Sequence, residues 1–219
     1  MSLLFFALLA WQTPIDEGTL VVRADTAVIA RETFRLASIR IGVGGTGWTL
    51  ASTVRYNHPV LVLAPILEVT ADTQPSGLEF DVADPRDPRR IRGQLSRGRF
   101  TTRSLARRTE RAREFPVVGR TVLLDDSVFA PYLFVAWLAR PQPVEISGLV
   151  ARADRREILV IRDLGVGPTL LNRAVVQLRH VTVTGGANQL VDVWVDEHAR
   201  LCKVEIPSRR LRVERLPPA

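Results

Sequence analysis

Few residues of this sequence combine a side chain and a spacing suited to catalysis. They are His58, His180, His198, Cys202 and the adjacent pair Asp125–Asp126. No two histidines have metal-ligand spacing, and neither H-E-x-x-H, C-x-x-C nor G-x-S-x-G occurs. Adjacent carboxylates before an apolar run are typical of a helix start. The sequence therefore favours a protein that is not an enzyme, and it predicts no metal ion and no cofactor.

The sequence contains one motif typical of dinucleotide-binding proteins, but without the helix that such a site needs. Gly42–Gly47 matches G-x-G-x-x-G. A dinucleotide site needs a helix directly after these glycines, so that helical N–H groups meet the pyrophosphate. Here Trp48–Val54 alternates between apolar and polar residues like a strand. We therefore interpret the glycines as a flexible hairpin loop.

Arginine provides most of the positive charge. The chain has 30 basic and 23 acidic residues, a net charge of +7, and Lys203 is its only lysine. Arginines are densest over residues 86–113, where the odd spacing of Arg97, Arg99 and Arg103 predicts one sheet face that could contact an anion. The alternative is a solvated face that protects an exposed sheet edge. Few aromatic side chains lie nearby, which argues against nucleic acid as a partner.

A set of aromatic residues could line a hydrophobic pocket between a helix and a curved sheet. The same residues could equally fill a dry core. The set consists of Phe129, Tyr132, Phe134, Trp137, Trp48 and Trp194.

Short alternating segments dominate the rest of the chain and predict strands. One apolar segment, about residues 125–139, predicts a helix that is buried because it is apolar nearly all round. No repeat and no clear linker divides the chain. The predicted fold is mainly β, a single domain over residues 11–219. Its antiparallel curved sheet forms a half-barrel, a barrel or a sandwich around the helix.

The N-terminus predicts export. Met1–Ala10 is apolar and too short to span a bilayer, which takes about 20 apolar residues, so it resembles a signal peptide. The alternative is an N-terminal strand packed in the core. Cys202 is the only cysteine, so no internal disulfide is expected. The predicted location is periplasmic or extracellular, with no transmembrane span.

Several short motifs occur in a characteristic order along the chain. They are Gly18–Val22, Glu32–Phe34, Asp125–Phe129, Val193–Asp196 and Leu201–Glu205. In this order the chain resembles an uncharacterised family of secreted bacterial β proteins, distantly similar to lipoprotein-carrier half-barrels. Those carriers shelter acyl chains between a curved sheet and more than one helix, whereas this sequence predicts one helix. The resemblance implies fold and location, and it implies no catalytic residue.

Three functional hypotheses follow. The first is an exported protein that binds a hydrophobic or amphipathic, lipid-like ligand. The second is a structural or protein-interaction module of the cell envelope, with an envelope protein as its partner. The third is an enzyme whose site is assembled from separated residues such as His58, His180 and Asp126.

Overall fold

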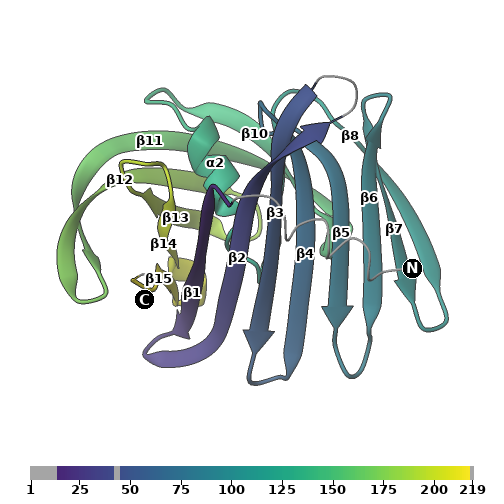
Figure 1. The fold of residues 1–219 in the computed structure, drawn as a ribbon, viewed down its shortest axis with the longest axis horizontal. Coiled ribbons are helices and arrows are strands. Elements are labelled where there is room, and N and C mark those ends of the chain that lie inside the picture. Colours follow the sequence, from purple (N-terminus) through teal and green to yellow (C-terminus); the bar gives the residue numbers. More distant parts are fainter. Residues whose placement is uncertain (1–13, 42–44, 218–219) are drawn as a thin grey trace.

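The computed structural model describes residues 14–41 and 45–217, which form one large sheet and a single α-helix. The strand order is β8-β7-β6-β5-β4-β3-β2-β1-β15-β14-β13-β12-β11-β10-β9. Among these strands only β9 and β10 pair in parallel. The sheet curves into an open roll around the helix (Figure 1). The predicted fold, a mainly β, curved antiparallel sheet with one buried helix, is confirmed.

The sheet is built from two meanders that meet in its middle. The first comprises β1 (Asp16–Ala24), β2 (Ala27–Ile41), β3 (Gly45–Tyr56), β4 (Leu61–Thr70), β5 (Pro75–Ala83), β6 (Arg89–Ser96), β7 (Arg99–Ala106) and β8 (Glu110–Pro116). The second comprises β9 (Thr121–Leu123), β10 (Val144–Val150), β11 (Arg155–Leu171), β12 (Ala174–Gly185), β13 (Gln189–Val195), β14 (Leu201–Ile206) and β15 (Leu211–Arg215). Pairing of β1 with β15 joins them.

Alternating side chains decide which face of the sheet turns inward. In β4, Leu63, Pro65, Leu67 and Val69 are buried, whereas the residues that alternate with them are partly exposed. Successive side chains of a strand point to opposite faces, so an alternating strand must bury one face. The apolar inner faces of both meanders therefore form one common core.

The two edges of the sheet differ. Six of the seven residues of β8 are exposed, the exception being Phe115. All three residues of β9 are buried, and β9 contacts β5. The short 3₁₀ turn η1 (Ala151–Ala153) likewise contacts β6. One edge thus lies inside the roll, covered by strands near the other edge, and the two edge strands do not pair.

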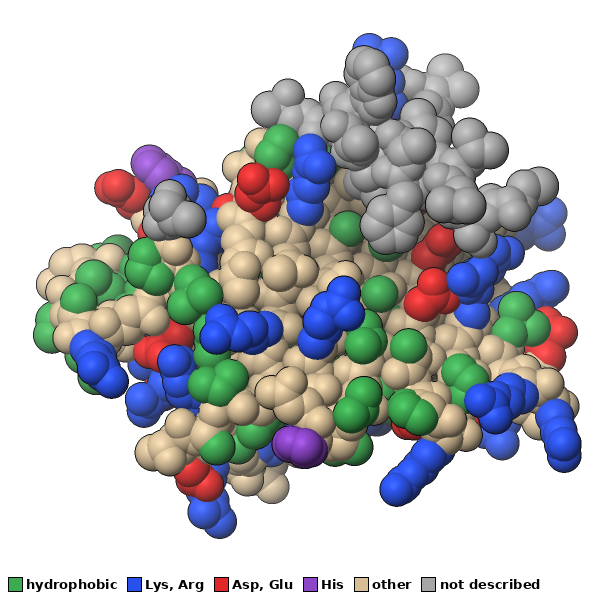
Figure 2. All heavy atoms as spheres, turned by 60° about the horizontal axis from the view of Figure 1, so that its bottom comes forward, with side chains coloured by type: hydrophobic (Ala, Val, Ile, Leu, Met, Phe, Trp, Pro, Cys, Tyr) green, Lys and Arg blue, Asp and Glu red, His purple; other side chains and the backbone are tan. Residues whose placement is uncertain are grey.

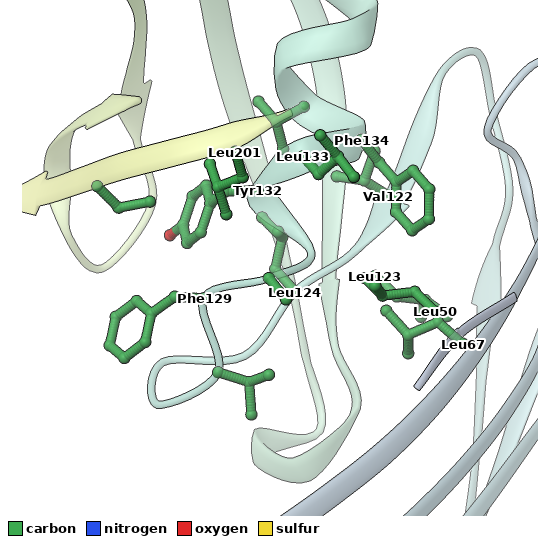
Figure 3. Packing of buried hydrophobic residues seen from close by; sticks show 14 of the residues in the cluster. Leu50, Leu67, Val122, Leu123, Leu124, Phe129, Tyr132, Leu133, Phe134 and Leu201 are labelled. Carbon is green, nitrogen blue, oxygen red and sulfur yellow. The ribbon is translucent and has the colours of Figure 1, made fainter. Parts of the chain in front are cut away.

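The helix α2 (Tyr132–Leu138) fills the interior (Figure 3). It is shorter than the predicted 125–139, and Pro131 rather than an aspartate occupies its N-cap position. Asp125 and Asp126 are therefore not helix caps; they form ion pairs with arginines, described below. Six of the seven helix residues are buried, as expected for a helix that is apolar on all sides.

The β11–β12 hairpin extends beyond the rest of the sheet as an arm, here defined as residues 164–178. It bends at a bulge between Asp163 and Gly165, where Gly165 adopts φ +85°, a conformation that favours glycine. The backbone N–H of Gly165 donates to Asp163 Oδ1 (2.8 Å), and Arg179 Nε donates to Asp163 Oδ2 (2.7 Å). The arm curls at the left of Figure 1.

Two predictions fall wholly or partly outside the described residues. The predicted signal peptide, Met1–Ala10, lies outside them, as do residues 42–44 of the glycine-rich loop. The remainder of that loop, Gly45–Gly47, is the start of strand β3 and not of a helix. Within residues 14–41 and 45–217, no helix has the length and apolar character needed to cross a membrane.

Candidate functional site

A fully buried carboxylate organises the interior. Glu32 on β2 accepts hydrogen bonds from Ser52 Oγ (2.6 Å) and from the backbone N–H groups of Phe129 (2.8 Å) and Ala130 (3.0 Å). Burial raises its pKa to about 7, although these three donors act in the opposite direction. Glu32 therefore ties the segment that leads into the helix onto the sheet.

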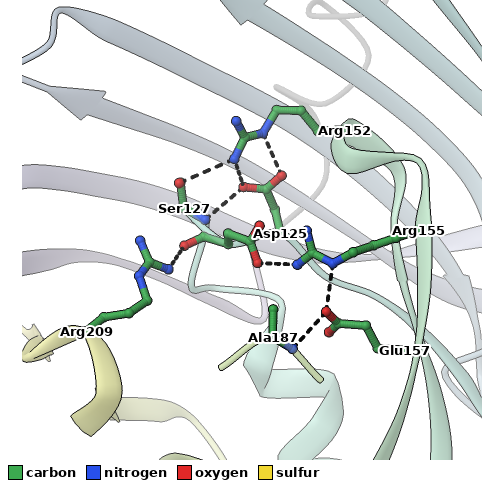
Figure 4. A network of polar contacts seen from close by, with 8 residues as sticks. Asp125, Ser127, Arg152, Arg155, Glu157, Ala187 and Arg209 are labelled. Carbon is green, nitrogen blue, oxygen red and sulfur yellow. Dashed lines mark hydrogen bonds and ion pairs between the residues drawn. The ribbon is translucent and has the colours of Figure 1, made fainter. Parts of the chain in front are cut away.

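Ion pairs also hold the segment before the helix, residues 125–131 (Figure 4). Arg152 donates two hydrogen bonds of 2.8 Å to Asp125, one to each carboxylate oxygen. Arg155 bridges Asp126 (2.6 Å) and Glu157 (2.7 Å), and Arg209 donates to the backbone carbonyl of Asp126. These carboxylates are already paired with arginines, so the network fixes residues 125–131 and offers no free acid or base.

Three of the predicted pocket residues are core residues. Phe129, Tyr132 and Phe134 are between 0 and 4% exposed, and Figure 3 shows them among Leu124, Leu133 and their neighbours. An interior gap lined in part by Leu67 and Leu124 measures about 10 Å³, which is room for about one water molecule at most.

Trp48 and Trp137 form an aromatic cluster with Phe134. Trp137 meets Trp48 and Phe134 edge-on, with ring centroids 5.5 Å apart in both pairs. Trp137 Nε1 donates to the backbone carbonyl of Ala199 (3.1 Å). Both tryptophans are partly exposed, and Trp48 Nε1 has no hydrogen-bond partner in the described chain. These two tryptophans pack against the edge of the main core.

Trp194 lies in a separate cluster, so the six predicted residues do not line one pocket. It packs with Leu178 and Cys202 apart from the main core. His180 stacks on its ring (4.6 Å between centroids) and Lys203 Nζ lies 4.6 Å above it. Burial raises the pKa of the Cys202 thiol to about 11, which keeps it protonated and unsuited to nucleophilic attack.

The arm covers this second cluster and is fastened to the body at its tip. Asn172 Nδ2 donates to the backbone carbonyl of Arg215 (2.7 Å), and Lys203 Nζ donates to that of Leu170 (3.1 Å). Leu171 and Val176 pack against the cluster. An otherwise free-standing hairpin is thus held over the body at its far end.

Between the arm and the start of β1 lies a groove of about 940 Å³, here called the arm groove. Its apolar lining comes from both sides: Leu171, Ala174 and Val176 of the arm, and Pro14, Ile15, Leu216 and Pro217 of the body. Both arginines of its lining are paired, Arg215 with Asp16 (2.6 Å) and Arg200 with Asp196 (2.7 Å), and Glu17 adds one further negative charge. The groove thus combines apolar walls with nearly balanced charge.

The predicted arginine face is only partly formed. Arg97 lies in the turn between β6 and β7 at φ +51°, so the expectation that it shares one strand face with Arg99 and Arg103 is wrong. A two-residue turn breaks the alternation on which that expectation rested. Arg99 pairs with Glu114 (3.4 Å), and Arg103 borders a second groove, described below.

The residues considered for catalysis do not converge. His180 Nε2 lies 2.7 Å from Asp192 Oδ1, His58 lies in the β3–β4 turn, and Asp126 pairs with Arg155. In the described part of the chain, no three His, Cys, Asp or Glu side chains are placed to hold a metal ion.

The described residues thus form a curved, β-barrel-like sheet around one buried helix, with grooves on its outer surface. No protein-family model and no curated protein matches the sequence. The chain is similar to a solved structure, a β-barrel-like protein of domain of unknown function DUF1849 from Brucella abortus, with a TM-score of 0.53 and 11% sequence identity. The match covers 93% of this chain and 98% of the other. At this identity the likeness concerns the fold.

Sequence reasoning missed both outer grooves. The strand that leads into the arm had a signal that could have been used: apolar residues occupy both alternating positions along Ile158–Ile161, and apolar residues continue into the arm at Leu164, Val166 and Leu170. A strand that is apolar on both faces must be covered on both or leave one exposed. The groove itself depends on how the arm bends, which the alternation does not specify.

Proposed function

We propose that this is an exported envelope protein that binds a lipid-like amphipathic molecule in the arm groove. The observation that carries the proposal is the groove itself, about 940 Å³ in size with apolar walls on the arm and on the body. Ligand sites typically measure about 300–1,000 Å³ and are mostly apolar with a few polar groups. An acyl chain would lie along the apolar walls, with its head group beside Arg200 and Arg215.

The charge of the groove favours a small head group over a polyanion. Both arginines are neutralised by aspartates, and Glu17 also lines the groove. A strongly anionic partner would therefore gain little attraction here. A mostly apolar molecule with a zwitterionic or singly charged head fits this balance best.

Because the groove is open on one side, it can cover only part of an acyl chain, and this sets the expected affinity. Each buried methylene contributes about 0.8 kcal/mol. A chain of about sixteen methylenes with half of its surface covered would gain about 6 kcal/mol before association costs. Binding should therefore be readily reversible, which suits a protein that acquires and releases its ligand.

The outward side of the arm supports an approach to a lipid surface. Of the twelve large apolar side chains exposed in the described chain, four lie on the arm: Leu164, Val166, Leu170 and Val175, which are 51–73% exposed. Leu170 and Val175 are cross-strand partners. Figure 2 shows hydrophobic side chains gathered on the projecting arm, at its left. Such a cluster is typical of a surface that meets another apolar surface.

Export rests on the sequence of Met1–Ala10, whose apolar character resembles a signal peptide. The test of export is N-terminal sequencing of the protein isolated from its native cell fraction. A mature protein starting near Trp11 outside the cytoplasm supports this part of the proposal. The intact N-terminus in the cytoplasm would contradict it.

The binding test is native mass spectrometry with lipid extraction, followed by titration with palmitate and lysophosphatidylglycerol. We expect one acyl-chain molecule per protein. Ala174→Trp, which fills the groove from an exposed position of the arm, should weaken binding at least tenfold. Ala112→Trp, at an exposed position on β8, is the matched control and should bind like the unaltered protein.

Two results would overturn the groove as a lipid site. One is a protein that stays empty after incubation with both lipids. The other is equal binding by Ala174→Trp. Either result would leave the structural or protein-interaction module as the better hypothesis, with the exposed face of the arm as its docking surface.

A further inference from the structure

We propose a second binding site, on the outer faces of β4–β7, that takes a phosphorylated saccharide. A groove of about 540 Å³ lies there and does not touch the arm groove. The residues that matter are Glu68, Gly77 and Glu79 at one side and Arg92, Thr101 and Arg103 at the other. This site is independent of the proposed lipid binding.

Two arginines lie side by side on this face, and Arg92 also has Glu79 of β5 as its cross-strand partner on the other side. Arg92 on β6 and Arg103 on β7 are direct cross-strand partners, and like charges in this position repel. Neighbouring arginines have carboxylate partners, Arg90 with Asp81 (2.6 Å) and Arg99 with Glu114 (3.4 Å). Neither Arg92 nor Arg103 forms an ion pair within the described chain. An oxyanion bound between them would relieve the repulsion, and guanidinium groups suit phosphate geometry.

Beside the arginines, Gly77 of β5 leaves room for the side chain of its cross-strand partner Glu68, whose carboxylate lies over it. Gly77 faces the groove, and a Cβ atom there would lie 2.8 Å from Glu68 Oε2. The adjoining lining is polar, with Gln94, Ser96 and Thr101. Hydroxyl, amide and carboxylate groups provide both donors and acceptors for sugar hydroxyls.

Glu68 and Glu79 select against a uniformly charged polymer. Burial, and then the nearby charge of Glu79, raise the pKa of Glu68. Two carboxylates across from two arginines would repel a long polyanion such as a nucleic acid, whose charges repeat along its length. A molecule with one localised phosphate and several hydroxyls satisfies both sides of the groove.

The test is an NMR titration of the full chain with glucose 6-phosphate, inorganic phosphate and glucose as separate probes. We expect glucose 6-phosphate to shift the amide signals of Gln94, Thr101 and Arg103 and to bind at least tenfold more tightly than either other probe. The double variant Arg92→Gln/Arg103→Gln should lose at least tenfold in affinity. Arg111→Gln/Arg113→Gln on exposed β8 removes the same charge elsewhere and should leave affinity unchanged.

A second variant tests the floor of the groove without removing charge. Gly77→Val would push the Glu68 carboxylate away from the strand and place a branched side chain on the floor of the groove, so it should weaken glucose 6-phosphate binding at least tenfold. Equal affinity for inorganic phosphate and glucose 6-phosphate would overturn the saccharide class. An equal loss in the β8 control would overturn the site. Palmitate binding should be unchanged in every one of these variants.

Discussion

The interior of the roll and the arm groove are both lined by apolar residues, yet they differ in how space is filled. In the interior, α2 and the inner faces of the strands leave a gap of about 10 Å³ beside Leu67 and Leu124. Between the arm and the body, a groove of about 940 Å³ stays open. A helix has side chains on all sides and fills a curved sheet, whereas a hairpin fastened at its tip leaves space beneath it. The comparison shows that Phe129, Tyr132 and Phe134 lie in the packed core, and it is the open outer groove that supports the proposed binding.

The largest effect should come from opening the interior. Phe134→Ala removes a ring that is 1% exposed and contacts Trp137. We expect a loss of about 3–5 kcal/mol in the free energy of unfolding, measured by urea denaturation. Palmitate binding by the folded fraction should be retained. A loss of less than about 1 kcal/mol would mean that the interior is not tightly packed.

The pH dependence of the free energy of unfolding tests the role of the buried Glu32. Glu32 has a raised pKa of about 7 against an ordinary value of 4.5. The unfolded chain therefore releases this proton at lower pH than the folded chain, and the free energy of unfolding falls as pH rises from about 4.5 through 7. The loss due to Glu32 should be about 3 kcal/mol.

The measurement is urea denaturation at a series of pH values. Glu32→Gln does not titrate and should flatten the profile over this range, whereas Glu114→Gln, at an exposed ion pair, should keep it. An unchanged slope in Glu32→Gln would contradict the assignment of this titration to Glu32.

The smallest effect on stability should come from unfastening the arm. Asn172→Ala removes the hydrogen bond to the carbonyl of Arg215 and places alanine at φ +48°. We expect a loss of about 1 kcal/mol in the free energy of unfolding. Hydrogen exchange should accelerate at residues 170–176 and stay unchanged in α2. The control is Gln177→Ala, at an exposed position of the arm. If hydrogen exchange in the arm accelerated equally in this variant, the role of Asn172 would be contradicted.

The alternation of apolar residues, which is visible in the sequence, determined much of the fold. It predicted a mainly antiparallel, curved sheet and the burial of the one helix found in the described residues, because each alternating strand and each apolar helix must bury its apolar face. The run from Tyr132 to Leu138 was identified as helical, but its start was placed at Asp125. Those aspartates instead meet Arg152 and Arg155, partners about 30 residues away that local preferences cannot reveal.

Tertiary structure alone decided where binding surfaces arise. The covering of β9 by strands near the opposite edge, the bend at Gly165 and the fastening of Asn172 to Arg215 all depend on contacts between distant segments. They place Trp194 on the outer surface under the arm, apart from Phe134. Alternation assigns a residue to a face of its strand. Only the curvature of the whole sheet determines whether that face meets the core, an arm or solvent.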